Sequence, residues 1–249
     1  MIGYPNITKL TGISDPDILL DFADIEEALR LGIAKPVKTI PGKGLLAAIE
    51  DEVVYILCAL DKESSAQLMK ELPKDRTVVL CIHGEEAIEL AKEELGAAYE
   101  DTYYQYVYTG SSEDISKHMK CADDYDLEIF HPGDEYFDTV KEYYDLVPEE
   151  DLRRDFHYPS FLGGLSDGEL ACFIGLHGEG AMGLLRVFPQ FRRRGFAEKI
   201  YSTLIYNQLK RGAIPYCHVD ITNDASIHLQ NKLGFVRAGM KVAWMVRRA

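Results

Sequence analysis

The fold is decided by the stretch Val187-Phe188-Pro189-Gln190-Phe191-Arg192-Arg193-Arg194-Gly195-Phe196-Ala197. An apolar run at 181–188 leads into it and predicts a buried strand, which Pro189 ends because proline cannot donate to a ladder. Beyond Gly195, apolar residues recur at helical spacing, and Gly212 stands where a helix C-cap glycine belongs. The sequence therefore predicts a strand, a short basic loop and a helix in direct succession.

The predicted loop has the composition of an anion site. The first backbone amides of a helix lack internal partners and, together with the helix dipole, attract negative charge. Gly195 lets a ligand approach the backbone closely, and the three arginines add full positive charge. The loop has neither the Gly-Lys-Ser/Thr of a P-loop nor the three spaced glycines of a dinucleotide fingerprint. A solvated basic turn is the competing interpretation.

Composition and charge narrow the class of ligand. The chain has 249 residues and a net charge of −14, which argues against a general nucleic-acid binder. Between Arg186 and Arg211, however, seven basic residues stand against one acid, Glu198. A small polyanion fits this local patch better than a long polymer does.

No membrane, disulfide or metal partner is expected. No apolar run approaches the ~20 residues of a membrane span, and the N-terminus has no signal pattern. The five cysteines form no Cys-X-X-Cys pair, and those at 58, 81 and 172 lie in apolar, strand-like runs. We interpret these three as core thiols and infer a reducing, cytoplasmic setting.

The periodic segments predict an α/β chain with two domains, 1–125 and 126–249, joined by the polar and acidic segment 113–126. In the first half, 36–44 is interpreted as a turn-rich connection. The second half has the order strand, two helices, three strands, helix, strand, helix, strand. The expected helices are 17–31, 64–72, 85–95, 136–146, 150–156, 196–209 and 223–233, and the expected strands are 45–49, 53–60, 77–82, 102–109, 127–130, 161–165, 170–176, 181–188, 214–221 and 241–246.

The basic loop and this order of elements resemble the GNAT superfamily of N-acetyltransferases. The acyl-CoA-binding motif of that family, Arg/Gln-X-X-Gly-X-Gly/Ala, is matched by Arg192-Arg193-Arg194-Gly195-Phe196-Ala197. In that family an Asn also opens the helix after the fifth strand, and the helix runs into Leu-Gly-Phe. Asn223 and Leu233-Gly234-Phe235 match these positions. The resemblance covers the second half and implies a mixed central sheet with flanking helices.

A narrower resemblance is to two-lobed glycine N-acyltransferase-like and FR47-like members. It is carried by the stretch Ile214-Pro215-Tyr216-Cys217-His218-Val219-Asp220. The first half is similar to a degenerate lobe, in which 77–82, 85–96 and 102–109 imitate the last elements of the second half. Because this lobe has no arginine loop, the resemblance implies that it does not bind CoA and forms one wall of the substrate cleft.

The resemblance also implies a cosubstrate and a reaction. The cosubstrate is acetyl-CoA or another acyl-CoA, and its acyl group passes directly to the primary amine of a small molecule such as an amino acid. The amides and arginines of 192–197 would hold the CoA pyrophosphate, with Asn223 among the cofactor-binding residues. The pantetheine would bond like an added strand to Leu185, Arg186 and Val187, and an amide near Val187 would stabilise the oxyanion.

The acid and base positions depart from the family pattern. The position of the usual Tyr acid is Gln230, and the strand-five position of a Glu base is His218. The strand-four position of the base in glycine N-acyltransferases is Ala181, with Glu179 two residues earlier. We therefore name His218 and Glu179 as candidate bases. The alternatives are a packing role for His218, for instance against Asp220 on the same strand face, and an exposed turn at Glu179.

Two other functions remain open from the sequence. One is a CoA-binding protein without catalysis, which the missing Tyr and Glu favour. The other is a protein-interaction module that uses the acidic first half. The sequence does not indicate the amine acceptor, the acyl chain length or the oligomeric state, so a homodimer is also left open.

Overall fold

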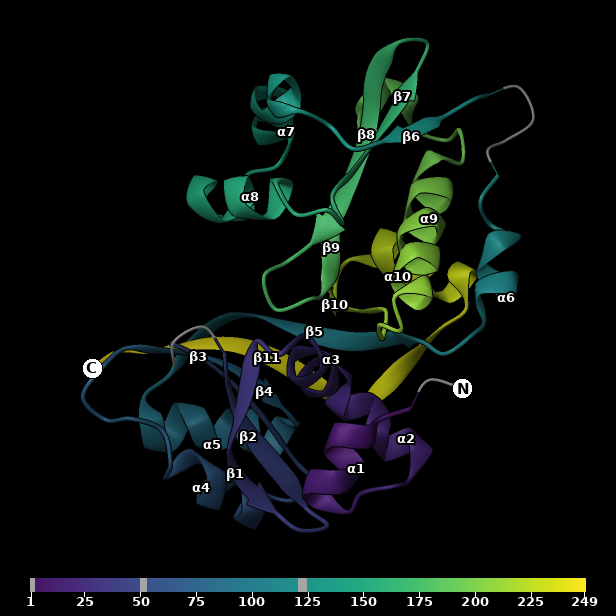
Figure 1. The fold of residues 1–249 in the computed structure, drawn as a ribbon. Helices are drawn as coiled ribbons and strands as arrows, with labels where there is room; N and C mark the ends of the chain where they lie inside the picture. Colours follow the sequence, from purple (N-terminus) through teal and green to yellow (C-terminus); the bar gives the residue numbers. More distant parts are fainter. Residues whose placement is uncertain (1–2, 50–52, 121–124) are drawn as a thin grey trace. The chain divides into compact units, whose positions relative to one another are not determined.

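Two β-sheets with flanking helices form the framework of the protein (Figure 1). The structure is a computed structural model and describes residues 3–49, 53–120 and 125–249. One sheet has the strand order β1-β2-β3-β4-β11-β5-β10, and the other has the order β6-β7-β8-β9. The first sheet is mixed, since β3 and β4 are parallel whereas β2/β3 and β4/β11 are antiparallel. The predicted α/β fold with a mixed sheet and flanking helices is therefore confirmed.

The seven-stranded sheet takes strands from both ends of the chain. Its strands are β1 (Ala34–Ile40), β2 (Gly44–Ile49), β3 (Val54–Ala59), β4 (Val78–His83), β5 (Ala98–Tyr108), β10 (Tyr216–Asp220) and β11 (Phe235–Arg247). The helices of the first hundred residues are α1 (Pro5–Thr11), α2 (Pro16–Leu19), the 3-10 turn η1 (Leu20–Phe22), α3 (Ala23–Leu31), α4 (Lys62–Met69) and α5 (Glu85–Leu95).

The four-stranded sheet lies entirely in the second half. Its strands are β6 (Glu128–Phe130), β7 (Leu162–Ser166), β8 (Glu169–Leu176) and β9 (Met182–Val187). The remaining helices are α6 (Ser112–Ser116), η2 (Asp134–Tyr136), α7 (Phe137–Tyr143), α8 (Glu149–Phe156), η3 (Pro189–Phe191), α9 (Phe196–Lys210) and α10 (Asp224–Leu233).

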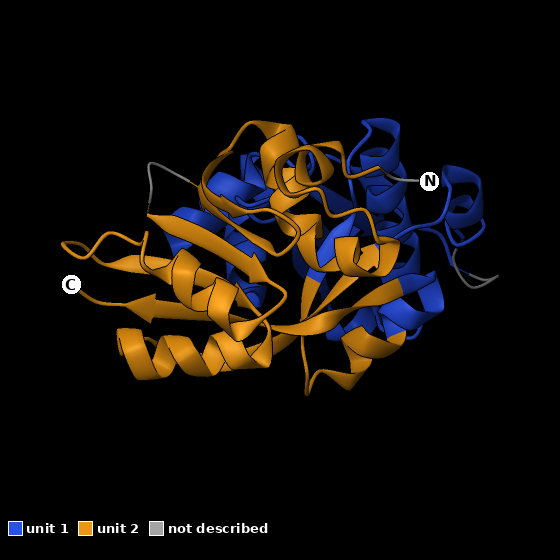
Figure 2. Ribbon diagram, turned by 90° about the horizontal axis from the view of Figure 1, so that it is seen from below, with its two compact units in different colours: residues 1, 108–217, 229–235 blue, residues 2–107, 218–228, 236–249 orange. Residues whose placement is uncertain are grey.

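The chain divides into two compact units, coloured separately in Figure 2. The four-strand unit contains 108–217 and 229–235, and the seven-strand unit contains 2–107, 218–228 and 236–249. These units differ from the division at 125/126 because the end of the chain joins the first-half sheet. In β11, Val242 lies opposite His83 and Arg247 opposite Val78 of β4. The assignment of 1–125 and 126–249 as functional lobes stays a prediction.

Each unit has its own apolar core. In the seven-strand unit, Leu46, Leu57 and Leu80 from β2, β3 and β4 are buried together with Leu68 of α4. Burying one such side chain contributes roughly 1.5–3 kcal/mol. In the four-strand unit, α9 packs against β7, β8 and β9 and is fully buried at Ile200 and Leu204. The helical spacing predicted after the basic loop thus places α9 against its sheet.

Most predicted elements are present with shifted ends, and three differ in kind. The helix expected at 17–31 is interrupted by η1, and the connection expected at 36–44 contains β1. β1 is an edge strand with an irregular register between Pro36 and Lys38, and an edge tolerates the missing proline N–H. The linker expected at 113–126 begins with α6, where Ser111 and Asp114 form a capping box. The last strand is longer than 241–246 because it pairs along β4.

Other expectations concern residues that the structure describes only in part. Cys58, Cys81 and Cys172 are buried free thiols, as expected, and Cys217 is a fourth buried free thiol. Cys121 and the turn predicted at 50–52 lie outside the described residues. Within the described ranges, none of the helices combines the length and apolar character needed to cross a bilayer.

Candidate functional site

The strand, loop and helix predicted around Gly195 follow one another as β9, η3, the arginine loop (residues 192–195) and α9. Gly195 is the N-cap residue of α9 and has a left-handed backbone, with φ 80° and ψ 2°. Arg193 is also left-handed, with φ 67°, which is uncommon for a residue other than glycine. No side chain of the described residues caps the N-terminus of α9. Its first amides are therefore available to an anion without displacing a protein cap.

The three arginines have different local roles. Arg192 donates from Nε to the Val187 carbonyl at 3.3 Å, and Arg194 donates from Nη2 to the Gln190 carbonyl at 3.1 Å. The guanidinium of Arg194 also lies 5.1 Å from the centre of the Phe191 ring. Arg192 and Arg193 are exposed. Arg192 and Arg194 thus hold the shape of the loop, while exposed positive charge surrounds the start of α9.

β9 carries an irregularity that sequence reasoning missed. Its register against β8 shifts between Phe173 and Gly175, and Leu184 has a left-handed φ of 56°. Such a bulge bends a strand and redirects the groups that follow it. A Cβ on Gly175 would lie 2.8 Å from Phe161 Cδ2 and 2.9 Å from Leu184 Cδ1, so a larger residue opposite the bulge would force these side chains to shift. The glycine in the middle of an apolar strand was the available signal.

The bulge comes directly before the predicted cofactor strand, Leu185 to Val187. β9 is the last strand of its sheet, so one edge of its backbone is unpaired within the described sheet. The side chain of Arg186 is engaged elsewhere, since its Nε donates to the Tyr143 carbonyl at 2.6 Å. An unpaired strand edge is the kind of backbone to which an extended ligand can add. The predicted contact of 185–187 with a pantetheine stays a prediction.

Asn223 caps α10, as its position predicted. Its Oδ1 accepts from the Ser226 amide at 3.1 Å, which satisfies one of the first amides of the helix. This bond orients the start of α10. The predicted contribution of Asn223 to cofactor binding stays a prediction.

Glu179 lies half-buried in the turn that joins β8 to β9. The Tyr216 hydroxyl donates to its carbonyl oxygen at 3.0 Å and so ties the turn to β10. The neighbouring His177 has its Nδ1 3.8 Å from an oxygen of the buried Asp155. Burial lowers the pKa of His177, but the nearby Asp155 carboxylate and the charge of Glu179 outweigh it and raise the pKa above its usual value. This titratable group was missed because Asp155 comes from α8, far from His177 in sequence.

The position of the usual Tyr acid is occupied by a buried amide. Gln230 is 2% exposed and contacts the hydroxyl of Tyr201. Burial, and then the neighbouring Cys217, raise the pKa of Tyr201 well above its usual value, and burial raises the pKa of Cys217 to about 12. Both groups therefore keep their protons near neutral pH. Neither side chain therefore has a pKa suited to proton transfer at physiological pH.

His218 on β10 lies in a chain of hydrogen bonds within the seven-strand unit. Trp244 Nε1 donates to His218 Nδ1 at 3.2 Å, and an indole nitrogen can only donate. Gln105 donates from Nε2 to the Leu20 carbonyl, so its Oε1 accepts from His218 Nε2 at 2.8 Å. These bonds hold His218 as the neutral tautomer with its proton on Nε2.

The expected partner of His218, Asp220, is engaged elsewhere. Its Oδ1 accepts from the Thr222 amide at 2.7 Å, in the turn before α10. The carboxylate beside His218 is instead Asp24, whose Oδ2 lies 3.9 Å from His218 Nε2. The predicted role of His218 as a base stays a prediction, and it requires the Nδ1 lone pair to be released from Trp244.

Comparisons with known proteins bear on this arrangement. Residues 164–245 match the family model described as FR47-like protein. A Drosophila protein of known structure has a TM-score of 0.68 and 16% identity, with 99% of this chain and 94% of that chain covered. The GCN5-related N-acetyltransferase from Kribbella flavida has a TM-score of 0.58 and 11% identity, with 94% and 96% covered. No curated protein sequence matches the chain significantly.

A tandem GNAT protein from the clavulanic acid biosynthesis pathway is also similar, with a TM-score of 0.50, 14% identity, and 91% of this chain and 87% of that chain covered. The chain has the GNAT fold, and its residues 164–245 are similar to FR47-like proteins. The region that matches the FR47-like model runs from β7 to β11, so it contains β9, the arginine loop and α9. Every candidate residue named from the sequence, from Glu179 to Asn223, falls inside that region.

Proposed function

We propose that the protein is an acyl-CoA-dependent N-acyltransferase that modifies the primary amine of a small molecule, with acetyl-CoA as the default donor. The observation that carries this proposal is the continuity of β9 with α9. A bulged edge strand leads into a loop with exposed arginines and a helix N-terminus that no side chain of the described residues caps. An acyl-CoA needs both features, an extended edge for its pantetheine and an anion site for its pyrophosphate.

In this proposal the pyrophosphate binds at the amides of Gly195, Phe196 and Ala197. Arg192, Arg193 and Arg194 supply positive charge around it, and Asn223 supports the site through the start of α10. The pantetheine amides bond to the backbone of Leu185, Arg186 and Val187. A backbone N–H near Val187 then donates to the thioester oxygen as that oxygen becomes negative, which lowers the barrier because the donor is already oriented.

The reaction itself is a direct transfer. The neutral amine attacks the thioester carbonyl carbon, a C–N bond forms, and the C–S bond breaks as the oxyanion collapses. The amine loses a proton to a base or to water, and the CoA thiolate leaves and is protonated. We propose His218 and Glu179 as the candidate bases. His218 has one lone pair, on Nδ1, and can accept the proton only after Trp244 releases it.

The first-half lobe, 1–125, is proposed to lack a CoA site and to serve structure and acceptor binding. Its helix α4 follows β3 as α9 follows β9, but the start of α4 is occupied. Asp61 accepts a hydrogen bond from the Ser64 amide at 2.8 Å. This bond is the main reason that the pKa of Asp61 is lowered to about 2, and the Ser64 side chain and Lys43 lower it further. A carboxylate already satisfies this helix start, so it would repel a pyrophosphate.

One further observation favours a second function, CoA binding without catalysis. The usual acid position is the buried Gln230, and the lone pair of His218 is engaged. Turnover of acetyl-CoA, followed as free thiol with a panel of small amines and amino acids, separates the two. Amine-dependent thiol release that Gly195→Asp abolishes supports the enzyme. CoA binding without thiol release on any amine supports the binding protein. The buried cysteines carry no disulfide, which suits the cytoplasm as the proposed location.

A further inference from the structure

A group of side chains with metal-ligand chemistry lies in the seven-strand unit, apart from the arginine loop in sequence. It consists of Asp24 on α3, Cys81 and His83 on β4, and His218 on β10. Cys81 and His83 are two residues apart on one strand and therefore share a face. One ligand atom from each of the four residues lies within 4.8 Å of the others. We call these four residues the Asp-Cys-His cluster.

The spacing in the cluster is close to that of a tetrahedral metal site. Zinc bonds of ~2.0–2.3 Å place neighbouring ligand atoms roughly 3.3–3.7 Å apart. The Asp24 Oδ2 atom lies 3.8 Å from Cys81 Sγ and 3.9 Å from His218 Nε2. Cys81 Sγ lies 4.0 Å from His83 Nε2. Small side-chain rotations would bring all four atoms to one ion.

The shortest distance in the cluster is a buried ion pair. His83 Nε2 lies 2.8 Å from Asp24 Oδ2, and both side chains are 0% exposed. Burial raises the pKa of Asp24 and lowers that of His83, but their mutual charge and hydrogen bond outweigh burial in both. A buried pair of this kind gains little over its desolvation cost. The same two atoms, separated slightly, could bind a cation between them.

The charges of the cluster match a divalent ion. Asp24 as a carboxylate and Cys81 as a thiolate supply two negative charges, and two neutral imidazoles complete the set. With an ion of charge +2 the buried site is neutral, which avoids the cost of an uncompensated charge. Thiolate and imidazole ligands favour zinc over calcium or magnesium, which take oxygen ligands.

Neighbouring groups orient the ligands. The Ile25 amide donates to Asp24 Oδ1 at 2.8 Å, which leaves Oδ2 directed at the cluster. Such a hydrogen bond is usual around a metal ligand because it fixes the orientation of the side chain. His218 donates from Nε2 to Gln105 and accepts at Nδ1 from Trp244, and the Gln105 bond must open before Nε2 can bind an ion.

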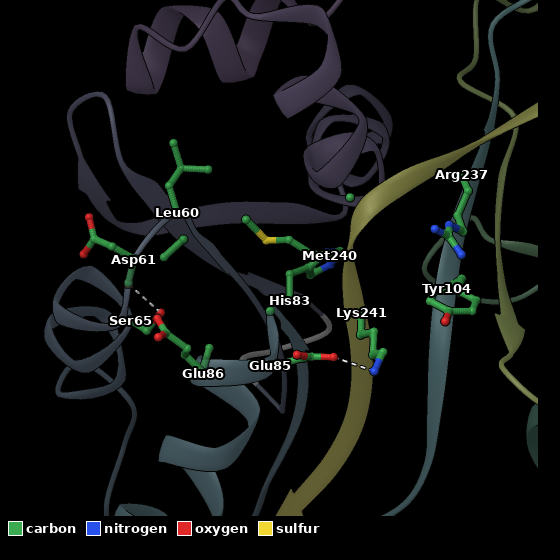
Figure 3. A pocket seen from close by; sticks show the side chains of 14 residues that line it. Leu60, Asp61, Ser65, His83, Glu85, Glu86, Tyr104, Arg237, Met240 and Lys241 are labelled. Atoms are coloured by element: carbon green, nitrogen blue, oxygen red, sulfur yellow. Dashed lines mark hydrogen bonds and ion pairs between the residues drawn. The ribbon is translucent and has the colours of Figure 1, made fainter.

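A pocket of ≈ 380 Å³ reaches the cluster from outside (Figure 3). His83 lines it together with Met240, and the acids Asp61, Glu85 and Glu86 lie around it. Glu85 forms an ion pair with Lys241 on its wall. His83 thus belongs to the wall of this pocket, although its side chain is fully buried.

We propose that Asp24, Cys81, His83 and His218 bind one zinc ion, which joins α3, β4 and β10. Four protein ligands with no open position make this a structural site. Ligand atoms from three elements far apart in sequence would be held together by one ion. Such a site adds its binding free energy to the stability of the folded unit.

Binding would rearrange the His218 hydrogen bonds. Ligation through Nε2 needs that nitrogen deprotonated, so the proton of neutral His218 moves to Nδ1. There it would face the N–H of Trp244, and two donors cannot bond, so the Trp244 contact must open. Trp244 is the single tryptophan of the chain, which makes its fluorescence a direct reporter. A ligated His218 would also have no lone pair for base catalysis, and Glu179 would remain as the candidate base.

The test uses the full-length protein, freed of metal by chelator and then dialysed against zinc. We expect one equivalent of bound zinc by elemental analysis, a rise in melting temperature and a change in Trp244 fluorescence with the same stoichiometry. Cobalt in place of zinc should produce a thiolate-to-cobalt absorption band. Cys81→Ser should abolish the band and weaken zinc binding at least about tenfold, and Asp24→Asn should also weaken it.

Cys172→Ser is the matched control, since Cys172 is also a fully buried strand thiol but lies in the four-strand unit. It should keep the cobalt band and the zinc stoichiometry. Folding of each variant is checked by circular dichroism, and the wild-type measurements stand even where a variant does not fold. The proposal is overturned if folded wild-type protein retains no zinc and shows no melting shift. Equal binding by wild type and Cys81→Ser would overturn it as well.

Discussion

Replacement of Gly195 by aspartate tests whether the start of α9 is the anion site of the protein. The left-handed backbone at Gly195, with φ 80°, is strained for most residues, but Asn and Asp tolerate it better than others. Gly195→Asn and Gly195→Asp have the same shape and nearly the same backbone cost. They differ in one negative charge, so their comparison separates electrostatics from strain.

The expected magnitude follows from the distance at which that charge would lie. A carboxylate at the N-cap would stand roughly 4 Å from a phosphate held by the first amides of α9. Two unit charges at that distance repel by about 1 kcal/mol in water and about 4 kcal/mol at the effective dielectric of a protein surface. We expect Gly195→Asp to bind CoA at least about tenfold more weakly than Gly195→Asn, or ~1.4 kcal/mol.

Isothermal titration calorimetry with CoA measures this difference, and circular dichroism checks the fold. Gly212→Asp is the matched control, because Gly212 is also left-handed, with φ 70°, a Cβ there would meet nothing within 4 Å, and it follows the opposite end of α9. It should bind CoA like the wild type. If Gly195→Asp and Gly195→Asn bound CoA equally, the pyrophosphate would not lie at this helix start.

Three further outcomes are expected. In protein freed of metal, His218→Ala should lower kcat by about a hundredfold, the usual scale for a general base, and leave the Kd for CoA unchanged by calorimetry; a variant with wild-type kcat would leave Glu179 or water as the base. Limited proteolysis within 113–126 should release no soluble, fully active 126–249 fragment, because β11 in that fragment would lose its partner β4; recovery of such a fragment by size-exclusion chromatography would contradict this. Asp61→Ala should lower stability to urea at neutral pH. The folded-state pKa of Asp61 is depressed to about 2, so the stabilisation by its carboxylate is fully present above the ordinary carboxyl pKa and is lost as pH falls through about 2. A stability difference between wild type and Asp61→Ala that did not shrink toward that pH would refute the capping role of Asp61.

The part of the site that could be predicted from the sequence is the part formed by residues close together in the chain. The arginine loop, its helix and the Asn223 cap depend on residues within a few positions of one another, and their geometry agrees with expectation. The bulge at Leu184 was not predicted, although Gly175 was visible in the apolar strand. Strand periodicity shows which face a side chain takes but not where a register shifts, since a bulge depends on the partner strand.

The sequence by itself thus determined most helices and strands, because hydrophobic period, capping residues and glycine positions act over one or two turns of chain. Tertiary structure alone decided which strands became neighbours. It placed β11 beside β4, and it placed Trp244 and Asp24, instead of Asp220, beside His218. The Asp-Cys-His cluster follows from the same sheet order, since its ligands lie at positions 24, 81, 83 and 218. No short-range sequence pattern predicts that these four residues lie close together, because their proximity arises only when burial of separate apolar faces fixes the order of the strands.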